Sequence, residues 1–315
     1  MTGRVNLVTS TEQEFGTESN PLIIKQAATD SGATSALQTA GNATLTGIET
    51  KLTDKSQFVK LTDGTHDADI FSNKALSVDD IYLAIARQEI TGYTAGNKAG
   101  RNVDIDIGSE DVIGQGGTYT PPTTARVHNI ASSSANDTAA GTGARTVSIN
   151  GLLADYSEAN ETITMNGTTN VPTVNSYIFI NRMRVETAGS TDSNVGTITA
   201  TAVTDATISA QIDAAYGQAA LGVFLVPLGK TMYLTKFGAA MIGTGNVSVN
   251  LMTKVFGGAY TVRNNLSLNN NSSTTAERKY DFPLRITEKT YVKIRATSSA
   301  LNSDVSCYFD YLLVG

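Results

Sequence analysis

Histidine is the side chain that most often moves protons in catalysis, and the sequence contains two, His66 and His128. Each stands alone in its segment. A serine nucleophile needs a histidine base oriented by an acid, and the chain has no G-x-S-x-G elbow to present such a serine. We interpret His66 as a residue of a solvated turn and His128 as a strand side chain, rather than as a metal ligand or a base. The sequence therefore predicts no catalytic residues and a protein that is not an enzyme.

The densest acidic stretch, residues 102–111, is the main candidate for metal binding. Strand alternation would place Asp104 and Asp106 on one face, where their oxygens could share a hard cation such as calcium. The stretch lacks the spacing of a calcium loop, because Gly108 is displaced and no glutamate closes the loop. A solvated strand face is the favoured interpretation, and we predict no metal site.

The glycine-rich stretches and the single cysteine also lack the context of a cofactor site. Residues 114–117 and 141–143 lack the Lys-Ser or Lys-Thr ending of a phosphate-binding loop. Cys307 has no second cysteine with which to form an intrachain disulfide or a CxxC metal site. It lies in the alternating apolar run 305–314, where we expect a small buried side chain. We predict no cofactor.

The composition indicates which elements must carry these residues. Of the 315 residues, 40% are hydrophobic and only 17% are charged, which excludes a highly charged disordered chain. The net charge of −6, without clustered Lys and Arg, argues against a nucleic-acid partner and against polybasic membrane attachment. No window approaches the roughly 18 apolar residues of a membrane span, and the N-terminus lacks the apolar core of a signal peptide. We expect a mainly β protein, made in the cytoplasm and not inserted in a membrane.

Strand patterns fill the C-terminal two thirds of the chain. Between residues 125 and 212 short β-prone runs alternate with turns, and in 290–296 Val292 and Ile294 alternate with polar side chains. The expected strands are 126–131, 145–150, 161–165, 177–187, 196–202, 206–212, 219–226, 231–241, 246–255, 260–266, 276–283, 290–296 and 305–314. We predict two antiparallel β-sandwich domains, a module at 123–214 and a jelly-roll-like domain at 215–315.

The first 122 residues contain short elements rather than the pattern of a domain. Residues 76–122 are predicted to form a helix and an extended linker. The predicted helix begins at a capping box formed by Ser77 and Asp80. Its apolar face, which we expect to be buried, consists of Val78, Ile81 and Ile85 together with Tyr82. Residues 1–75 are predicted to form an N-terminal extended arm with short helices, used for attachment and oligomerisation.

Two apolar groups in the arm support that interpretation. One is a β-prone run of the kind that adds to a partner's sheet edge, the anchoring strand Leu22, Ile23 and Ile24. The other has helical spacings that approximate a coiled-coil seam, the predicted oligomer interface Leu37, Leu45, Ile48 and Leu52. The helical spacing of this second group has two interpretations. The helix packs on the core of its own chain, or it associates with the same helix of other copies. A Leu/Ile seam without a buried polar residue can support more than two chains, which favours a homotrimer.

Three segments of the chain resemble known proteins. Residues 36–52, with Thr-Ala-Gly-Asn-Ala-Thr-Leu followed by Ile-Glu-Thr-Lys-Leu, are similar to a segment of tailed-bacteriophage virion structural proteins. The strand-turn Leu-Thr-Asp-Gly-Thr at 61–65 resembles a second segment of these proteins. Residues 132–168 look like a β-module of environmental phage structural proteins. The resemblance covers about half of the chain.

The resemblance implies a non-enzymatic protein of the virion. Such a protein would be exposed on the particle as a tail or neck fibre-type appendage or as a capsid decoration. Its N-terminal arm would anchor it to other virion proteins of the capsid, portal or tail, and its β-domains would project outward.

A second function remains open, namely a module that binds a host receptor or glycan through the C-terminal sandwich. Sugar sites usually present exposed aromatic side chains, and the chain has no tryptophan. The tyrosines that could take this role are Tyr216, Tyr233, Tyr260 and Tyr280, although core packing would explain most of them. A polysaccharide depolymerase is a third and weaker alternative.

Overall fold

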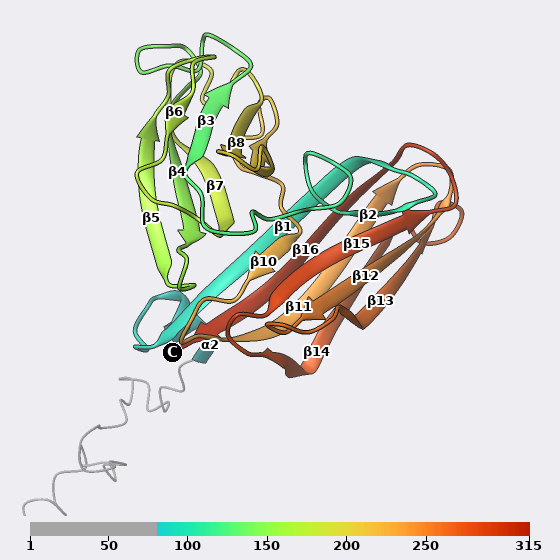
Figure 1. Ribbon diagram of the computed structural model, residues 1–315. Helices are drawn as coiled ribbons and strands as arrows, with labels where there is room; N and C mark the ends of the chain where they lie inside the picture. The colour runs from blue at the N-terminus through green and yellow to red at the C-terminus, as the bar shows by residue number, and fades with distance from the viewer. Residues whose placement is uncertain (1–80) are drawn as a thin grey trace, which may run out of the picture. The chain divides into compact units, whose positions relative to one another are not determined.

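The structure of the protein is a computed structural model that describes residues 81–315, all within one compact unit, Asp79–Gly315 (Figure 1). This unit is mainly β and its sheets are antiparallel, as the sequence predicts. The predicted arm at 1–75 lies outside the described residues. Within residues 81–315 no helix is long and apolar enough to cross a membrane.

The predicted helix is confirmed as α2, Ile81–Ala86, and it is shorter than the apolar run suggested. Ile85 is buried as expected, but Ile81 and Tyr82 are more than half exposed. The side chains that the helix buries are Ala84 and Ile85. The expected apolar face is therefore wrong in part, because so short a helix contacts β1 over less than two turns.

Two sheets are built from strands at both ends of the described chain. The first sheet has the order β1 (Tyr93–Ile105), β16 (Ser303–Val314), β11 (Thr231–Ile242) and β14 (Thr275–Ile286). The second has the order β10 (Val223–Leu225), β15 (Tyr291–Ser298), β12 (Asn246–Lys254) and β13 (Thr261–Asn269), and β2 (Ser109–Asp111) also pairs with β15. We call residues 93–111 and 223–314 the two-sheet domain.

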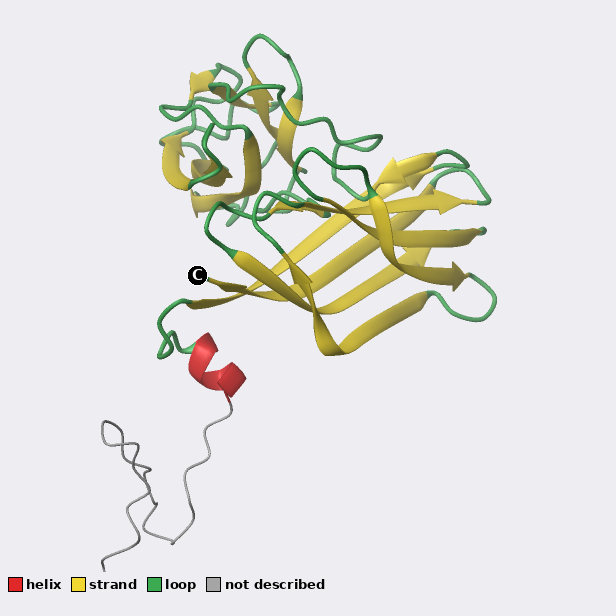
Figure 2. Ribbon diagram, turned by 60° about the horizontal axis from the view of Figure 1, so that its bottom comes forward, coloured by secondary structure: helices red, strands yellow, loops and turns green. Residues whose placement is uncertain are grey.

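The two sheets enclose one hydrophobic core. Alternate residues of the central strands point inward, and Phe237 of β11, Phe309 of β16 and Ile294 of β15 are fully buried there. In β16 the alternation runs along nearly the whole strand, as the period of two for strands requires. The view in Figure 2 shows the strands of this domain as two layers.

The remaining strands form an inserted domain, residues 112–222, between β2 and β10. One sheet has the order β6 (Val171–Pro172), β3 (His128–Ser132), β8 (Ile198–Ala202) and β9 (Ile208–Ile212). The other has the order β5 (Glu158–Thr164), β4 (Ala144–Leu152) and β7 (Phe179–Ala188). Their inward side chains share a second core that includes Ile130, Val147 and Phe179.

Most of the expected linker before residue 123, residues 93–111, forms strands of the two-sheet domain. Within it, β1 pairs antiparallel with β16 from Tyr93↔Val314 to Asn102↔Val305 (Figure 1). The strand has few apolar residues because it is an edge strand whose outer residues are exposed. Its glycines also interrupt the alternation of apolar and polar side chains that marks a strand in the sequence. Gly96 is required because a Cβ there would meet the ring of Tyr311 at 2.5 Å.

Candidate functional site

The inserted domain is joined to the two-sheet domain by two neighbouring segments. Gly222 N donates to Val112 O at 2.9 Å, and Ile113 pairs with Leu221 in an antiparallel bridge. Val112 N donates to Ile294 O of β15 at 2.9 Å, and Ile294 N donates to Gly222 O at 2.8 Å. Both connections are therefore fixed to the same strand, and we call this region the junction.

β1 passes so close to the junction that it needs a glycine there. A Cβ on Gly100 would lie 2.3 Å from Val112 O and 2.4 Å from Gly222 N. Both neighbours are backbone atoms that hydrogen-bond to each other, so they cannot move apart without breaking the junction.

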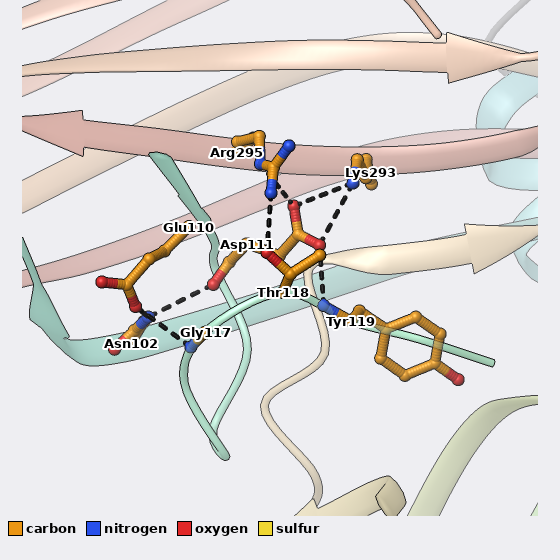
Figure 3. A network of polar contacts seen from close by, with 8 residues as sticks. All are labelled: Asn102, Glu110, Asp111, Gly117, Thr118, Tyr119, Lys293 and Arg295. Atoms are coloured by element: carbon orange, nitrogen blue, oxygen red, sulfur yellow. Dashed lines mark hydrogen bonds and ion pairs between the residues drawn. The ribbon is translucent and has the colours of Figure 1, made fainter. Parts of the chain in front are cut away.

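Asp111, the last residue of β2, is the charged centre of the junction (Figure 3). Its side chain is fully buried. Oδ2 accepts hydrogen bonds from Tyr119 N at 2.8 Å and from Lys293 Nζ at 3.2 Å. Oδ1 lies 3.1 Å from Lys293 Nζ and 3.1 Å from Arg295 Nε, in ion pairs without hydrogen-bond geometry. One carboxylate thus joins the loop after β2 to two cations of β15.

Polar contacts on either side of Asp111 hold the same loop (Figure 3). Glu110 Oε2 accepts hydrogen bonds from Gly117 N at 3.0 Å and from Asn102 Nδ2 at 3.1 Å. Arg295 Nη2 donates to Thr118 Oγ1 at 2.8 Å. Since these charged groups are paired with one another, the network positions the connection rather than offering a free acid or base.

Lys98 of β1 makes a second buried contact between the two domains. It is 4% exposed and donates to the backbone oxygen of Asn181 in β7. The Asn181 amide in turn pairs with Leu225 of β10, donating to Leu225 O at 3.0 Å and accepting from Leu225 N at 2.9 Å. Burial, reinforced by Arg182, lowers the pKa of Lys98 to about 7.

We expect Lys98 to make the stability of the protein rise with pH. Its pKa falls from about 10.4 in the unfolded chain to about 7 in the native state, so between these values the unfolded chain binds the extra proton. The free energy of unfolding should gain up to about 1.4 kcal/mol per pH unit in that window. Denaturant unfolding at pH 6, 7.5 and 9 should show a shallower rise for Lys98→Met than for wild type. The exposed-lysine control Lys279→Met should keep the wild-type slope, and equal slopes for both variants would contradict the prediction.

A groove of about 670 Å³ lies on the first sheet beside the segment that returns from the inserted domain. Its lining comes from β1, β11, β14, β16 and residues 216–220. Small side chains form much of the lining: Ala99, Gly100, Ala219, Ala220, Ala239, Ala240 and Ala276. The same lining includes Arg101, Tyr216, Gln218, Glu277 and Tyr308.

The polar side chains of the groove hold one another in place. Arg101 Nε donates to Asp304 Oδ1 at 3.0 Å, and Arg101 Nη1 donates to the hydroxyl of Tyr216. The hydrogen bond to Asp304 is the main reason why the pKa of Arg101 lies above its usual range. The hydroxyl of Tyr308 donates to Glu277, which raises the pKa of Tyr308 to about 12 and lowers that of Glu277.

The acidic residues that suggested calcium have separate roles in the structure. Asp104 is exposed, and its backbone N–H donates to Asn102 Oδ1 at 2.9 Å. Asp106 Oδ1 accepts a hydrogen bond from Asn302 N at 3.0 Å, which ties the loop after β1 to the loop before β16. Among the described residues, no three His, Cys, Asp or Glu side chains form a group that could hold a metal ion.

His128 is confirmed as a strand side chain. It is fully buried at the start of β3, with Nδ1 2.9 Å from Arg126 O and Nε2 2.8 Å from Ser209 Oγ. Burial lowers its pKa. Cys307 is likewise buried in the core of the two-sheet domain, where burial raises the pKa of its thiol to about 12.

The four candidate tyrosines do not gather at one place. Tyr216 lines the groove and is 48% exposed. Tyr280 packs against the core, and its hydroxyl accepts a hydrogen bond from Asn264. Tyr260 lies over Lys293, whose Nζ is 4.3 Å from the ring centre. Tyr233 is partly buried and is not part of the groove lining.

The predicted assembly residues of the arm lie outside the described residues. These are the anchoring residues Leu22, Ile23 and Ile24 and the interface residues Leu37, Leu45, Ile48 and Leu52. His66 and the start of the helix at Ser77 lie outside as well.

The junction and most of the groove were not identified from the sequence. In the sequence Asp111 is one of several acidic residues, and the alternation of Lys293 with Val292 and Ile294 predicts a solvated position for Lys293, although it is buried. The available signal was that Lys293 and Arg295 repeat with a period of two, which places two cations on one face.

No family model matches the sequence, and no curated protein matches it. Among solved structures, similar chains come from infectious bursal disease virus. The structure of the Gt strain is 12% identical over 71% of this chain and 72% of that chain, with a TM-score of 0.17. The T=1 particles derived from the virus give 13% identity over 70% and 69%, with a TM-score of 0.16. The Gx strain gives 9% identity over 70% of each chain, with a TM-score of 0.17. Likeness at this level identifies neither the family nor the function of the chain.

Proposed function

We propose that the protein is a non-enzymatic structural component of a bacteriophage particle. It is exposed there as a tail or neck fibre-type appendage or as a capsid decoration. The observation that carries the proposal is the strand order of the two-sheet domain, considered together with the resemblance of residues 36–52, 61–65 and 132–168 to virion proteins.

The strand order supports a jelly roll. Taken along the chain, the eight main strands of the domain are β1, β2, β11, β12, β13, β14, β15 and β16. The first, eighth, third and sixth form one sheet, and the second, seventh, fourth and fifth form the other. This is the order of a double Greek key, the architecture used by capsid proteins and lectins. β10, which follows the insertion, pairs with β15 at positions 291–293, next to the positions 295–297 that pair with β2.

The junction supports an arrangement in which the jelly roll carries the inserted domain as an addition. Both connections leave from β15 and its neighbours, so an extra domain is carried without interrupting the pairing of the jelly roll. A module grafted in this way can acquire its own contacts while the host domain keeps its packing.

The N-terminal arm anchors the protein and sets its oligomeric state in this proposal. The run Leu22–Ile24 adds to a sheet edge of a neighbouring capsid, portal or tail protein. The seam of Leu37, Leu45, Ile48 and Leu52 joins three copies. Light scattering of the full-length protein should give the mass of a trimer, and Leu45→Asp should give a monomer. A monomeric wild type would contradict this part of the proposal.

The particle itself provides the direct test. Purified virions from the source of the gene, washed in high salt, should contain the full-length protein by mass spectrometry, and cryo-EM should place it on the outer surface. Recovery of the protein only from the soluble fraction of infected cells, with none on washed particles, would overturn the proposal. An internal position would overturn the surface assignment.

A further inference from the structure

The groove on the first sheet has two aromatic side chains that are fixed in position. The ring of Tyr308 lies over Gly238 of β11, where a Cβ would approach the ring to 2.4 Å. Its hydroxyl is held by Glu277, and that of Tyr216 is held by Arg101. The two tyrosines therefore present orientations that do not have to be found during binding, which reduces the entropy cost of association.

The groove floor leaves room beside these rings. Ala240 is partly exposed in the lining, and neighbouring strands place Ser306 and Thr275 opposite Ala240. A volume of about 670 Å³ is within the range of pockets that hold small ligands, roughly 300–1,000 Å³.

The charges of the groove indicate a neutral ligand. Among the described residues that line it, Arg101 is the cation and Glu277 is the acid. Arg101 is already paired with Asp304 through two nitrogens, and Glu277 receives a hydrogen bond from Tyr308 and lies 3.6 Å from Lys236 Nζ. An anion or a cation would have to displace one of these pairings. The lone pairs of Glu277 and Gln218 and the hydroxyls of Ser306 and Thr275 can still bond to hydroxyl groups.

We propose that this groove binds a neutral saccharide unit. One ring face of the sugar, which carries C–H groups, stacks on Tyr216 or Tyr308, while the sugar hydroxyls bond to the side chains along the rim. Tyrosine suits this role because it joins an apolar ring to a polar end. The inference goes beyond the proposed role in the virion and does not depend on it.

Binding is tested with the full-length protein on an array of neutral hexose oligosaccharides together with their sialylated and sulfated analogues. The wild type should bind neutral members and prefer them to the charged analogues. Calorimetry with the best neutral oligosaccharide then compares variants. Ala240→Phe fills the floor and should abolish binding, and Tyr216→Ala should weaken it at least about tenfold. Thr164→Phe, an exposed strand position on the inserted domain, should bind like wild type.

Several outcomes would overturn the inference. These are no binding to any neutral oligosaccharide, preferred binding of the acidic analogues, or wild-type affinity in both Ala240→Phe and Tyr216→Ala. Circular dichroism and thermal unfolding confirm that each variant is folded. If Ala240→Phe fails to fold, Tyr216→Ala decides the result, because Tyr216 lies in an exposed turn. A wild type that binds no sugar yet remains on washed virions would reject the groove assignment and leave the proposed function intact.

Discussion

Replacing Asp137 with asparagine should lower the free energy of unfolding by about 2–6 kcal/mol. The Asp137 side chain is fully buried in the inserted domain. Oδ1 accepts hydrogen bonds from Ala144 N and Val195 N, both at 2.8 Å. Oδ2 accepts from Gly196 N at 2.8 Å and from Ser132 Oγ at 2.6 Å. An asparagine has one acceptor oxygen, so two of these four donors would face an amide N–H instead, and each buried unsatisfied group costs about 1–3 kcal/mol.

The matched control for this experiment is Asp192→Asn. Asp192 is exposed in a turn with φ 54°, a conformation that asparagine also tolerates. Denaturant unfolding followed by circular dichroism should therefore show a large loss for Asp137→Asn and little change for Asp192→Asn. Equal stability of the two variants would refute the assignment of Asp137 as a buried anchor.

Replacing Asp111 with asparagine should destabilise the protein by about 3–5 kcal/mol, because it leaves two cations at the junction without their carboxylate. The cost falls mainly on Lys293, whose side chain is 7% exposed, rather than on Arg295, which is 25% exposed. Burial already lowers the pKa of Lys293, and Asp111 opposes that shift. The deficit of the variant should therefore shrink as the pH rises, since Lys293 can then lose its proton in the folded state.

A double variant separates the charge effect from a general loss of packing. Asp111→Asn with Lys293→Met removes the stranded cation together with its partner, and such paired removal is often close to neutral. The double variant should be more stable than Asp111→Asn alone in urea unfolding. If the two single effects simply add, the carboxylate and the ammonium are not coupled and the prediction is wrong.

The strands from residue 126 onward could largely be predicted from the sequence. Runs such as 246–255 and 305–314 alternate cleanly between apolar and polar residues because one face of each strand is buried and the other is wet. Each of the expected runs corresponds to a strand in the structure. This periodicity is a local property of the sequence, so it can be recognised without knowledge of the tertiary fold.

The edge strand β1 could not be predicted in this way. Its residues 93–105 include two glycines and several polar residues, and both glycines are required by close neighbours, a tyrosine ring at Gly96 and the junction backbone at Gly100. Tyr311 and Gly222, which require these glycines, lie more than a hundred positions away in the sequence. Because β1 was missed, the domain predicted at 215–315 lacked its first two strands.

The junction and the groove could not be predicted from the sequence, because their residues come from distant segments of the chain. Asp111 and Lys293 are separated by 182 positions, and their pairing follows from the register of β2 on β15. Tyr216 is a candidate from the sequence only as one of four tyrosines that could take the place of the missing tryptophan. Tyr308 is not, because within its strand it reads as one more alternating residue.

Residues 132–147 belong to the segment that resembles a β-module of phage structural proteins, and the structure gives a physical reason for their composition. They surround Asp137, whose carboxylate joins the segment to the turn at 195–196. Gly143 is needed beside it, since a Cβ there would lie 2.0 Å from Asp137 Oδ1. Short polar residues and glycines in this block therefore serve one buried carboxylate, which composition alone cannot distinguish from an ordinary loop.

The pairing of Ile113 with Leu221 brings the two ends of the inserted domain side by side. Its two ends lie at hairpin distance, so a foreign domain with neighbouring termini could be joined at the same positions. Such a domain would also have to cover Lys98, Val223 and Leu225, which the inserted domain buries. In the proposed role on a particle, recombination at these two positions would exchange the displayed domain and keep the strand pairing of the two-sheet domain.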